Sequence, residues 1–386
     1  MGTGLITISL NPLMAESPEE LLRTDLKGQD RRFGEAFAVI KRGIADRAFP
    51  SASVAVVHSG VLVALQGFGR FTYESSSPRA AHDTIYDLAS LTKVVSTTAT
   101  AMILYDRGQM HLDTPVIELL PQFATDDDRR SEVTVRMLLT HTSGLPAYER
   151  LFLRFITRDK LLAASIKLPL VNEPGSVTEY SDVGFILLGE ILSHLADASL
   201  DSFVQRELFR PLQMTETTFR PQASLLPRIA PTEIDRDFRN GIVKGGVNDE
   251  NAWVLGGIAG HAGLFAPASD LARFAQCMLA GGCSLIRRDT IELFTTQDRT
   301  FPGSTRFGLG WDKPTPPSQA GQYFSSRSFG HLGFTGTSLW IDPDKQLAVI
   351  LLTNRTWSDR SSQVIKEVRP KFHDAVVEAI ESGARR

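Results

Sequence analysis

Cysteine and long apolar runs are both scarce in this chain of 386 residues, and each shortage excludes a class of protein. The two cysteines, Cys277 and Cys283, have no histidine or further cysteine nearby at the spacing of metal ligands. We therefore expect neither a metal site nor a disulfide framework. No apolar run approaches the roughly 20 residues that cross a bilayer, so we expect no membrane span.

An excess of one charge is also lacking. The 41 Lys and Arg residues nearly balance the 44 Asp and Glu residues, and no long basic run occurs. Proteins that bind nucleic acid typically cluster positive charge, so we expect no nucleic-acid partner. Residues 1–10 contain a short apolar patch without the positive residues that begin a secretory signal. The protein is predicted to be cytoplasmic, or periplasmic or secreted if a leader has been removed.

What remains is the composition of an ordinary globular protein. It is 42% hydrophobic and 22% charged, which is enough for a large core. We expect an N-terminal tail over residues 1–29 and one compact domain over residues 30–386. Within that domain, residues 30–85 and 305–386 are predicted to form one lobe, and residues 86–304 a second, mostly helical lobe.

Strand patterns occur near both ends of the chain. Segments rich in apolar residues flank a short turn at residues 58–60 and another at residues 342–345, and each pattern predicts a β-hairpin. Helical spacing predicts terminal helices over about residues 32–49 and 362–381. We therefore predict an α+β fold in which an antiparallel sheet is flanked by the terminal helices and carries an inserted, mostly helical lobe. The cleft between the lobes is the expected site.

Ser90 and Lys93 form the most informative pair. From Leu88 to Tyr105 the only charged residue is Lys93, which predicts a buried helix. Residues three apart share a helix face, so the amine can lie beside the hydroxyl. Burial lowers the pKa of an amine, which would let Lys93 accept a proton from Ser90. A Ser-x-x-Lys pattern arises by chance about once in a chain of this length, so further motifs are needed.

Two further segments supply polar residues that could complete a site. Tyr180 and Asp182 lie in a turn just before the apolar run at residues 186–189. His331 and the glycine-rich residues after it lead into the second predicted hairpin.

With these three segments in order, the chain resembles the serine β-lactamase and penicillin-binding group. Class C β-lactamases, family VIII esterases and D-alanyl-D-alanine carboxypeptidases are the most similar members. The matches are Ser90-Leu91-Thr92-Lys93 to Ser-x-x-Lys, Tyr180-Ser181-Asp182 to Tyr-x-Asn, and His331-Leu332-Gly333 to Lys/His-Thr-Gly. Residues 138–146 and 255–265 also resemble family segments. The resemblance covers about residues 30–380 and implies a β-lactamase/transpeptidase-like fold.

The resemblance also implies roles. Ser90 would attack the acyl carbonyl, Lys93 would take its proton, and Tyr180 would relay a proton to the leaving group before the acyl-enzyme is hydrolysed. The backbone N–H groups of Ser90 and Phe334 would form the oxyanion hole. Gly333 would let substrate lie against the strand edge. A nearby ammonium would lower the pKa of the Tyr180 phenol. No metal or organic cofactor is implied.

Two departures from the family pattern bear on the substrate. Asp182 stands where the family usually has Asn, so a donor to the substrate is replaced by an acceptor. His331 stands where true β-lactamases commonly have Lys, so a permanent cation for a substrate carboxylate is missing. Esters need less help at the leaving group and less recognition of a carboxylate. We expect His141 and His261 to hold turns by hydrogen bonds, and whether His261 borders the cleft stays open.

These features predict a serine hydrolase that acts on a small ester, amide or β-lactam. The first prediction is a carboxylesterase for small acyl esters with weak or no β-lactamase activity. The alternatives are a D-amino-acid peptidase or D-Ala carboxypeptidase, and a module that binds a cell-wall fragment without turnover. The sequence leaves the natural substrate and the oligomeric state open.

Overall fold

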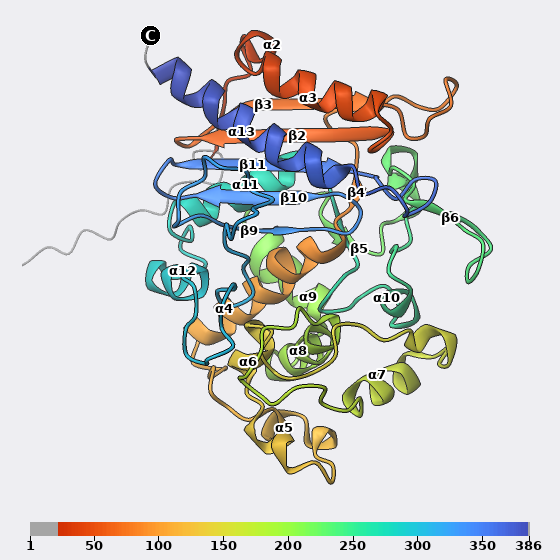
Figure 1. Cartoon of the computed structure of the whole chain (residues 1–386), viewed down its shortest axis with the longest axis vertical. Coiled ribbons are helices and arrows are strands. Elements are labelled where there is room, and N and C mark those ends of the chain that lie inside the picture. The colour runs from red at the N-terminus through yellow and green to blue at the C-terminus, as the bar shows by residue number, and fades with distance from the viewer. Residues whose placement is uncertain (1–21, 385–386) are drawn as a thin grey trace, which may run out of the picture.

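The computed structural model describes residues 22–384 and is built around a six-stranded sheet (Figure 1). The strand order is β1-β3-β2-β11-β10-β9, and every pairing is antiparallel except that of β1 with β3. Both predicted hairpins are confirmed, as β2–β3 and β10–β11. The bounds are β1 (Arg23–Thr24), β2 (Ser51–His58), β3 (Val61–Gly69), β9 (Phe329–Leu332), β10 (Ser338–Asp342) and β11 (Leu347–Thr353).

Helices cover both faces of this sheet, which explains why β2 and β11 are buried along nearly their whole length. On one face α3 (Gly34–Ala45) and α13 (Ile365–Ala384) pack against alternate residues such as Val54 and Val349. On the other face α11 (Ala268–Leu279) packs against the intervening residues, such as Ala55 and Ile350. This alternation follows from the two-residue period of a strand. A short helix, α2 (Gln29–Arg32), precedes α3.

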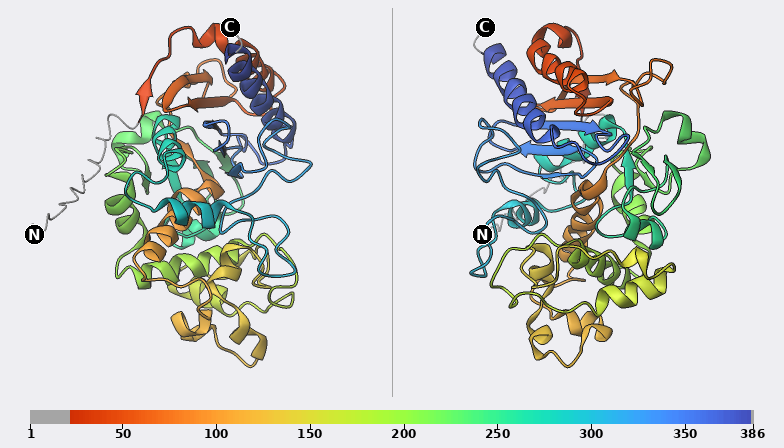
Figure 2. Two further views of the ribbon diagram at one scale, coloured as in Figure 1. Left: turned by 90° about the vertical axis from the view of Figure 1, so that its left-hand side faces the viewer. Right: turned by 45° about the vertical axis from the view of Figure 1, so that its right-hand side comes forward.

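The chain between the hairpins is mostly helical, as predicted, and apart from α11 most of its helices lie at the end of the molecule away from the sheet (Figures 1 and 2). Its α-helices are α4 (Ala99–Asp106), α5 (Val116–Leu119), α6 (Val135–Leu139), α7 (Arg158–Ile166), α8 (Asp182–Leu195), α9 (Leu200–Val204), α10 (Glu250–Val254) and α12 (Arg288–Thr295). Short 3₁₀ or π turns are η1 (Ala89–Leu91), η2 (Lys93–Thr98), η3 (Pro121–Phe123), η4 (Asp128–Glu132), η5 (Leu151–Leu153), η6 (Gln205–Phe209) and η7 (Ala223–Arg228).

Two small sheets lie within the same stretch. One joins β4 (Tyr86–Asp87), β8 (Leu264–Ala266) and β5 (Thr218–Phe219), and the other joins β6 (Glu233–Asp235) and β7 (Gly241–Val243). Strands of two or three residues are too short for a periodic pattern, so the sequence did not predict them. The β4–β8 pairing places residues 86–87, just before Ser90, beside residues 265–266.

The expected N-terminal tail is only partly described. Residues 1–21 lie outside the described residues, whereas Arg23 and Thr24 pair with Val61 and Leu62 at the edge of the sheet. The division into two lobes stays a prediction. Within residues 22–384, no single helix is long and apolar enough to cross a membrane. Helix α8 and residues 200–209 pass that test only as a pair bent by 67°, and most of α8 is buried in the core.

Candidate active site

The structure brings Ser90 and Lys93 together at an irregular start of the central helix. Ser90 lies in the 3₁₀ turn η1, Lys93 begins the π turn η2, and a regular α-helix begins only at Ala99. Lys93 Nζ donates to Ser90 Oγ at 3.0 Å. The predicted burial of Lys93 is confirmed, because its exposed fraction is 0%. Departures of this kind from α-helical geometry are frequent at functional sites.

The residue before Ser90 has an unusual backbone. Ala89 has a φ of +48°, a region that residues with a side chain rarely adopt. The buried Asp87 holds it there, because its Oδ1 accepts from Ala89 N at 2.8 Å and its Oδ2 from Asn248 N at 2.6 Å. Burial raises the pKa of Asp87 to about 6. The hydroxyl of Ser90 thus follows a strained backbone turn that the Asp87 carboxylate ties to Asn248.

Lys93 is also part of an ion pair, which corrects one expectation. Its Nζ lies 2.6 Å from Asp182 Oδ1 and donates to the backbone oxygen of His261 at 3.1 Å. Burial acts to lower the pKa of Lys93, as expected, but the carboxylate of Asp182 and the hydrogen bond with Tyr180 outweigh it. The pKa of Lys93 is therefore raised above its usual value, not lowered. In the free protein Lys93 is an ammonium ion.

Tyr180 lies over this pair, with its ring centroid 4.9 Å from Lys93 Nζ. The expected lowering of its pKa is wrong in net direction. Burial raises the pKa of Tyr180, whereas Lys93 and the contact with Ser90 lower it, and the effect of burial is the larger. The phenol is therefore protonated near neutral pH.

His331 faces the same cluster from β9, with its ring centroid 5.9 Å from that of Tyr180. Its Nδ1 lies 2.8 Å from the Leu332 carbonyl oxygen, which can only accept, so Nδ1 carries the proton. Burial, with the nearby charge of Lys93, lowers the pKa of His331 to about 3. The ring is thus neutral, and its Nε2 is an acceptor.

Two further histidines, His141 and His261, lie at the site. His141 Nδ1 accepts from Ser181 N at 3.0 Å, and burial lowers the pKa of His141 well below its usual value. It thus fixes the turn that carries Tyr180. His261 lines the cleft, which answers the question left open by the sequence, and its Nε2 lies 2.9 Å from Asp249 Oδ1.

The loop after β9 is joined to the segment that carries Ser90. Thr335 Oγ1 donates to Asp87 O at 2.8 Å, and Thr337 Oγ1 donates to Leu88 O at 3.0 Å. Gly333 lies at this junction, where a Cβ atom would come within 2.5 Å of Leu88 O. Within residues 22–384, no hydrogen bond uses the Phe334 N–H. The peptides of Ser90 and Phe334 are thereby held in a fixed relation beside the cleft.

A cleft of about 1140 Å³ passes over these residues. Six of the seven predicted site residues line it, and the seventh, Lys93, lies buried beneath them; the six are Ser90, Tyr180, Asp182, His331, Gly333 and Phe334. Within residues 22–384, no group of His, Cys, Asp and Glu is arranged to hold a metal ion.

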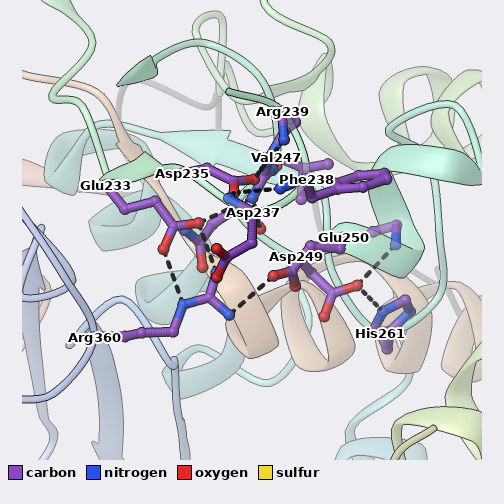
Figure 3. Close-up of polar contacts among 12 residues, drawn as sticks. Glu233, Asp235, Asp237, Phe238, Arg239, Val247, Asp249, Glu250, His261 and Arg360 are labelled. Carbon is purple, nitrogen blue, oxygen red and sulfur yellow. Dashed lines mark hydrogen bonds and ion pairs between the residues drawn. The ribbon is translucent and has the colours of Figure 1, made fainter. Parts of the chain in front are cut away.

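Part of the cleft wall, formed by Glu233, Asp235, Glu250 and Arg360, belongs to a network of ion pairs that sequence reasoning missed (Figure 3). Arg360 lies 2.6 Å from Glu233 and 3.0 Å from Glu250. Arg239 lies 2.9 Å from Glu233 and 2.6 Å from Asp235. The one local signal was the four-residue spacing of Asp235 and Arg239.

Comparisons with known proteins identify the family and the fold. The Beta-lactamase family model matches residues 36–369. A putative D-alanyl-D-alanine carboxypeptidase of Escherichia coli (strain K12) is 31% identical over 350 residues, which cover 81% of this chain and 80% of the relative.

Solved structures show the same fold. EstCE1, a hydrolase with promiscuous acyltransferase activity, has a TM-score of 0.74 at 20% identity, covering 90% of this chain and 99% of that one. The octameric penicillin-binding protein homologue from Pyrococcus abyssi has a TM-score of 0.69 at 22% identity, covering 91% and 77%. Together with the family match, these similarities confirm the predicted family resemblance and the α+β fold.

Proposed function

Because the chain belongs to the β-lactamase family of serine hydrolases, we propose that it is a carboxylesterase for small acyl esters, with weak or no β-lactamase activity. Ser90 is the proposed nucleophile, and the acyl group passes through an ester on its Oγ. Support comes from the 3.0 Å contact of Ser90 with Lys93 at the floor of the cleft.

The proposed reaction begins from the small fraction of protein in which Lys93 is a free amine. Lys93 takes the proton of Ser90 as Oγ bonds to the acyl carbon, and the N–H groups of Ser90 and Phe334 stabilise the oxyanion. The ester C–O bond then breaks, and the leaving oxygen receives a proton through Tyr180 from Lys93. Water then attacks the acyl carbon and gives its proton through Tyr180 to Lys93. The bond to Ser90 Oγ breaks, Oγ takes a proton back from Lys93, and the acid is released.

Asp182 sets how large that reactive fraction is. Its carboxylate lies 2.6 Å from Lys93 Nζ and stabilises the ammonium form. We expect kcat/KM to rise with pH until Lys93 loses its proton. The same contact keeps Lys93 beside Ser90 and Tyr180, so Asp182 orients the amine and also lowers its availability as a base.

The observation that favours esters is the neutral imidazole of His331. A substrate that ends in a carboxylate gains from a cation beside β9, and His331, with a pKa of about 3, supplies none at neutral pH. The residues that line the cleft include eight Asp or Glu and seven Lys or Arg, so its walls carry no net positive charge. An uncharged acyl ester needs no such anchor.

A D-Ala carboxypeptidase is the second candidate. The relative from E. coli is named a putative D-alanyl-D-alanine carboxypeptidase, and the match covers 81% of this chain. Such an enzyme would use the same Ser90 chemistry on the last peptide bond of a D-Ala-D-Ala peptide and would recognise its terminal carboxylate.

One panel of substrates separates the candidates. We would measure kcat/KM for p-nitrophenyl butyrate, nitrocefin, and N-acetyl-Lys-D-Ala-D-Ala as its free acid and as its methyl ester, with Ser90→Ala as control. The proposal predicts fastest turnover of the butyrate and loss of all activity in the control. A preference for the free acid over both the butyrate and the methyl ester would overturn the esterase assignment and support the carboxypeptidase.

A further inference from the structure

A buried arginine contacts the peptide unit that carries one of the two proposed oxyanion donors. Arg369, on α13, is only 5% exposed. Its Nη2 donates to Gly333 O at 2.7 Å and to Thr337 O at 2.9 Å, and its Nε donates to Gly336 O at 3.2 Å. Within residues 22–384, no carboxylate forms an ion pair with it. Buried cations are normally paired, so the placement of this guanidinium needs an explanation.

The carbonyl of Gly333 and the N–H of Phe334 belong to one peptide unit. That unit is trans, so its C=O and N–H point in opposite directions. A donor bound to the oxygen therefore fixes the direction of the N–H. Arg369 holds the oxygen, whereas no hydrogen bond within the described residues uses the N–H.

We propose that Arg369 is a positioning residue that aims and polarises the Phe334 N–H toward the oxyanion of the reacting ester. The inference rests on the proposed acyl-enzyme chemistry. A hydrogen bond from a cation is about twice as strong as one between neutral groups. It draws electron density from the peptide and so makes the N–H on its other end a better donor. Burial lowers the pKa of Arg369 to about 9, which leaves it charged at neutral pH.

Arg355 provides a matched comparison. Its Nε donates to Phe334 O at 2.6 Å, so it also holds a backbone carbonyl with a buried guanidinium. That carbonyl belongs to the next peptide unit, whose N–H is that of Thr335. Loss of Arg355 thus removes a similar cation and hydrogen bond one peptide away from the proposed donor.

The experiment reads the acyl carbonyl directly. The p-nitrophenyl ester of cinnamic acid, labelled with ¹³C at the carbonyl, is mixed with wild type, Arg369→Gln, Arg369→Lys and Arg355→Gln. Infrared difference spectra then record the carbonyl band of the ester on Ser90. Steady-state kcat and KM are measured on the same samples, and the concentration of folded sites is fixed by titration with a fluorophosphonate.

Stronger hydrogen bonds to the acyl oxygen lower its stretching frequency. We expect the band of Arg369→Gln to move to higher wavenumber and kcat to fall about 10- to 100-fold, less than the loss of a whole donor, with KM changed less than about threefold. Arg369→Lys keeps the charge, so its carbonyl band and its kcat should both lie between those of wild type and Arg369→Gln. In Arg355→Gln the band should stay at the wild-type position.

Three results would overturn the inference. One is an unchanged band and kcat in Arg369→Gln. Another is an equal band shift in Arg355→Gln, which would show only general loosening of this loop. The third applies if Arg369→Gln does not fold, because Arg369→Lys is then the test. A wild-type band with full kcat in Arg369→Lys, which lacks the planar guanidinium, would contradict the inference. Absence of any acyl band in wild type would instead refute the proposed function on which the inference rests.

Discussion

Replacing Gly333 with alanine tests the geometry of the proposed oxyanion hole. The added methyl group would lie 2.5 Å from Leu88 O and would also clash with the Thr337 side-chain oxygen. Ordinary van der Waals contact begins at 3.4 Å, so the two segments must separate by about 0.9 Å. Leu88 lies two residues before Ser90, and Gly333 lies one residue before Phe334. The displacement therefore falls between the two proposed donors.

A shift of this size moves one donor out of hydrogen-bonding range of an oxyanion. Loss of one such donor costs about 100- to 1000-fold in kcat. Because the interaction forms mainly in the transition state, KM should change little. Forcing a methyl group into a packed site also destabilises a protein by about 1–3 kcal/mol, so the variant should remain folded at 25 °C.

The assay is kcat and KM for p-nitrophenyl butyrate, together with urea unfolding. Gly34→Ala is the matched control, because a Cβ atom at Gly34 meets nothing within 4 Å and the residue lies in α3, away from the cleft. Near-wild-type kcat in a folded Gly333→Ala protein would refute the proposed oxyanion hole. A loss of equal size in Gly34→Ala would show that the effect is not local.

Three other predictions concern single side chains. Asp182→Asn removes the charge that raises the pKa of Lys93, so the alkaline rise of kcat/KM should move to lower pH, and an unmoved profile would contradict the role of the ion pair. Tyr180→Phe should slow an alkyl ester more than a p-nitrophenyl ester, whose leaving group needs no proton, and equal losses would argue against proton relay. Burial and, to a lesser degree, Arg369 hold the pKa of His373 at about 3, below the 6.5 of an unperturbed histidine. The neutral form of His373 therefore contributes stability that is complete above pH 6.5 and is lost as pH falls toward 3. The difference in unfolding free energy between wild type and His373→Gln should shrink by up to about 1.4 kcal/mol per pH unit below pH 6.5. A constant difference in urea unfolding between pH 4 and 7 would contradict that assignment.

The sheet and its flanking helices could be predicted because their signals are local. Strands β2, β3, β10 and β11 are apolar segments of five to nine residues joined by short turns, and α13 has a clear helical period. The strands β4 to β8 are only two or three residues long, and β4, β5 and β8 also depend on partners far along the chain. Their existence is decided by tertiary packing, which leaves no periodic pattern.

Within the site, the burial of Lys93 could be predicted from the sequence, but its protonation state could not. The charge-poor helix indicated that Lys93 is buried, but the direction of its pKa depends on Asp182, which lies 89 positions away in sequence and 2.6 Å away in space. Arg369 left no sequence signal, because it binds three backbone oxygens and every backbone has these. Likewise, the contact of Arg360 with Glu233 joins residues 127 positions apart.

The most direct test of the acyl-enzyme is rapid acid quench of the protein with p-nitrophenyl butyrate, followed by intact-mass measurement and peptide mapping. We predict a single butyryl adduct on the peptide that contains Ser90, formed within the first turnover and absent in Ser90→Ala. Full turnover without an adduct, or an adduct on another residue that persists in Ser90→Ala, would contradict the proposal that Ser90 is the nucleophile.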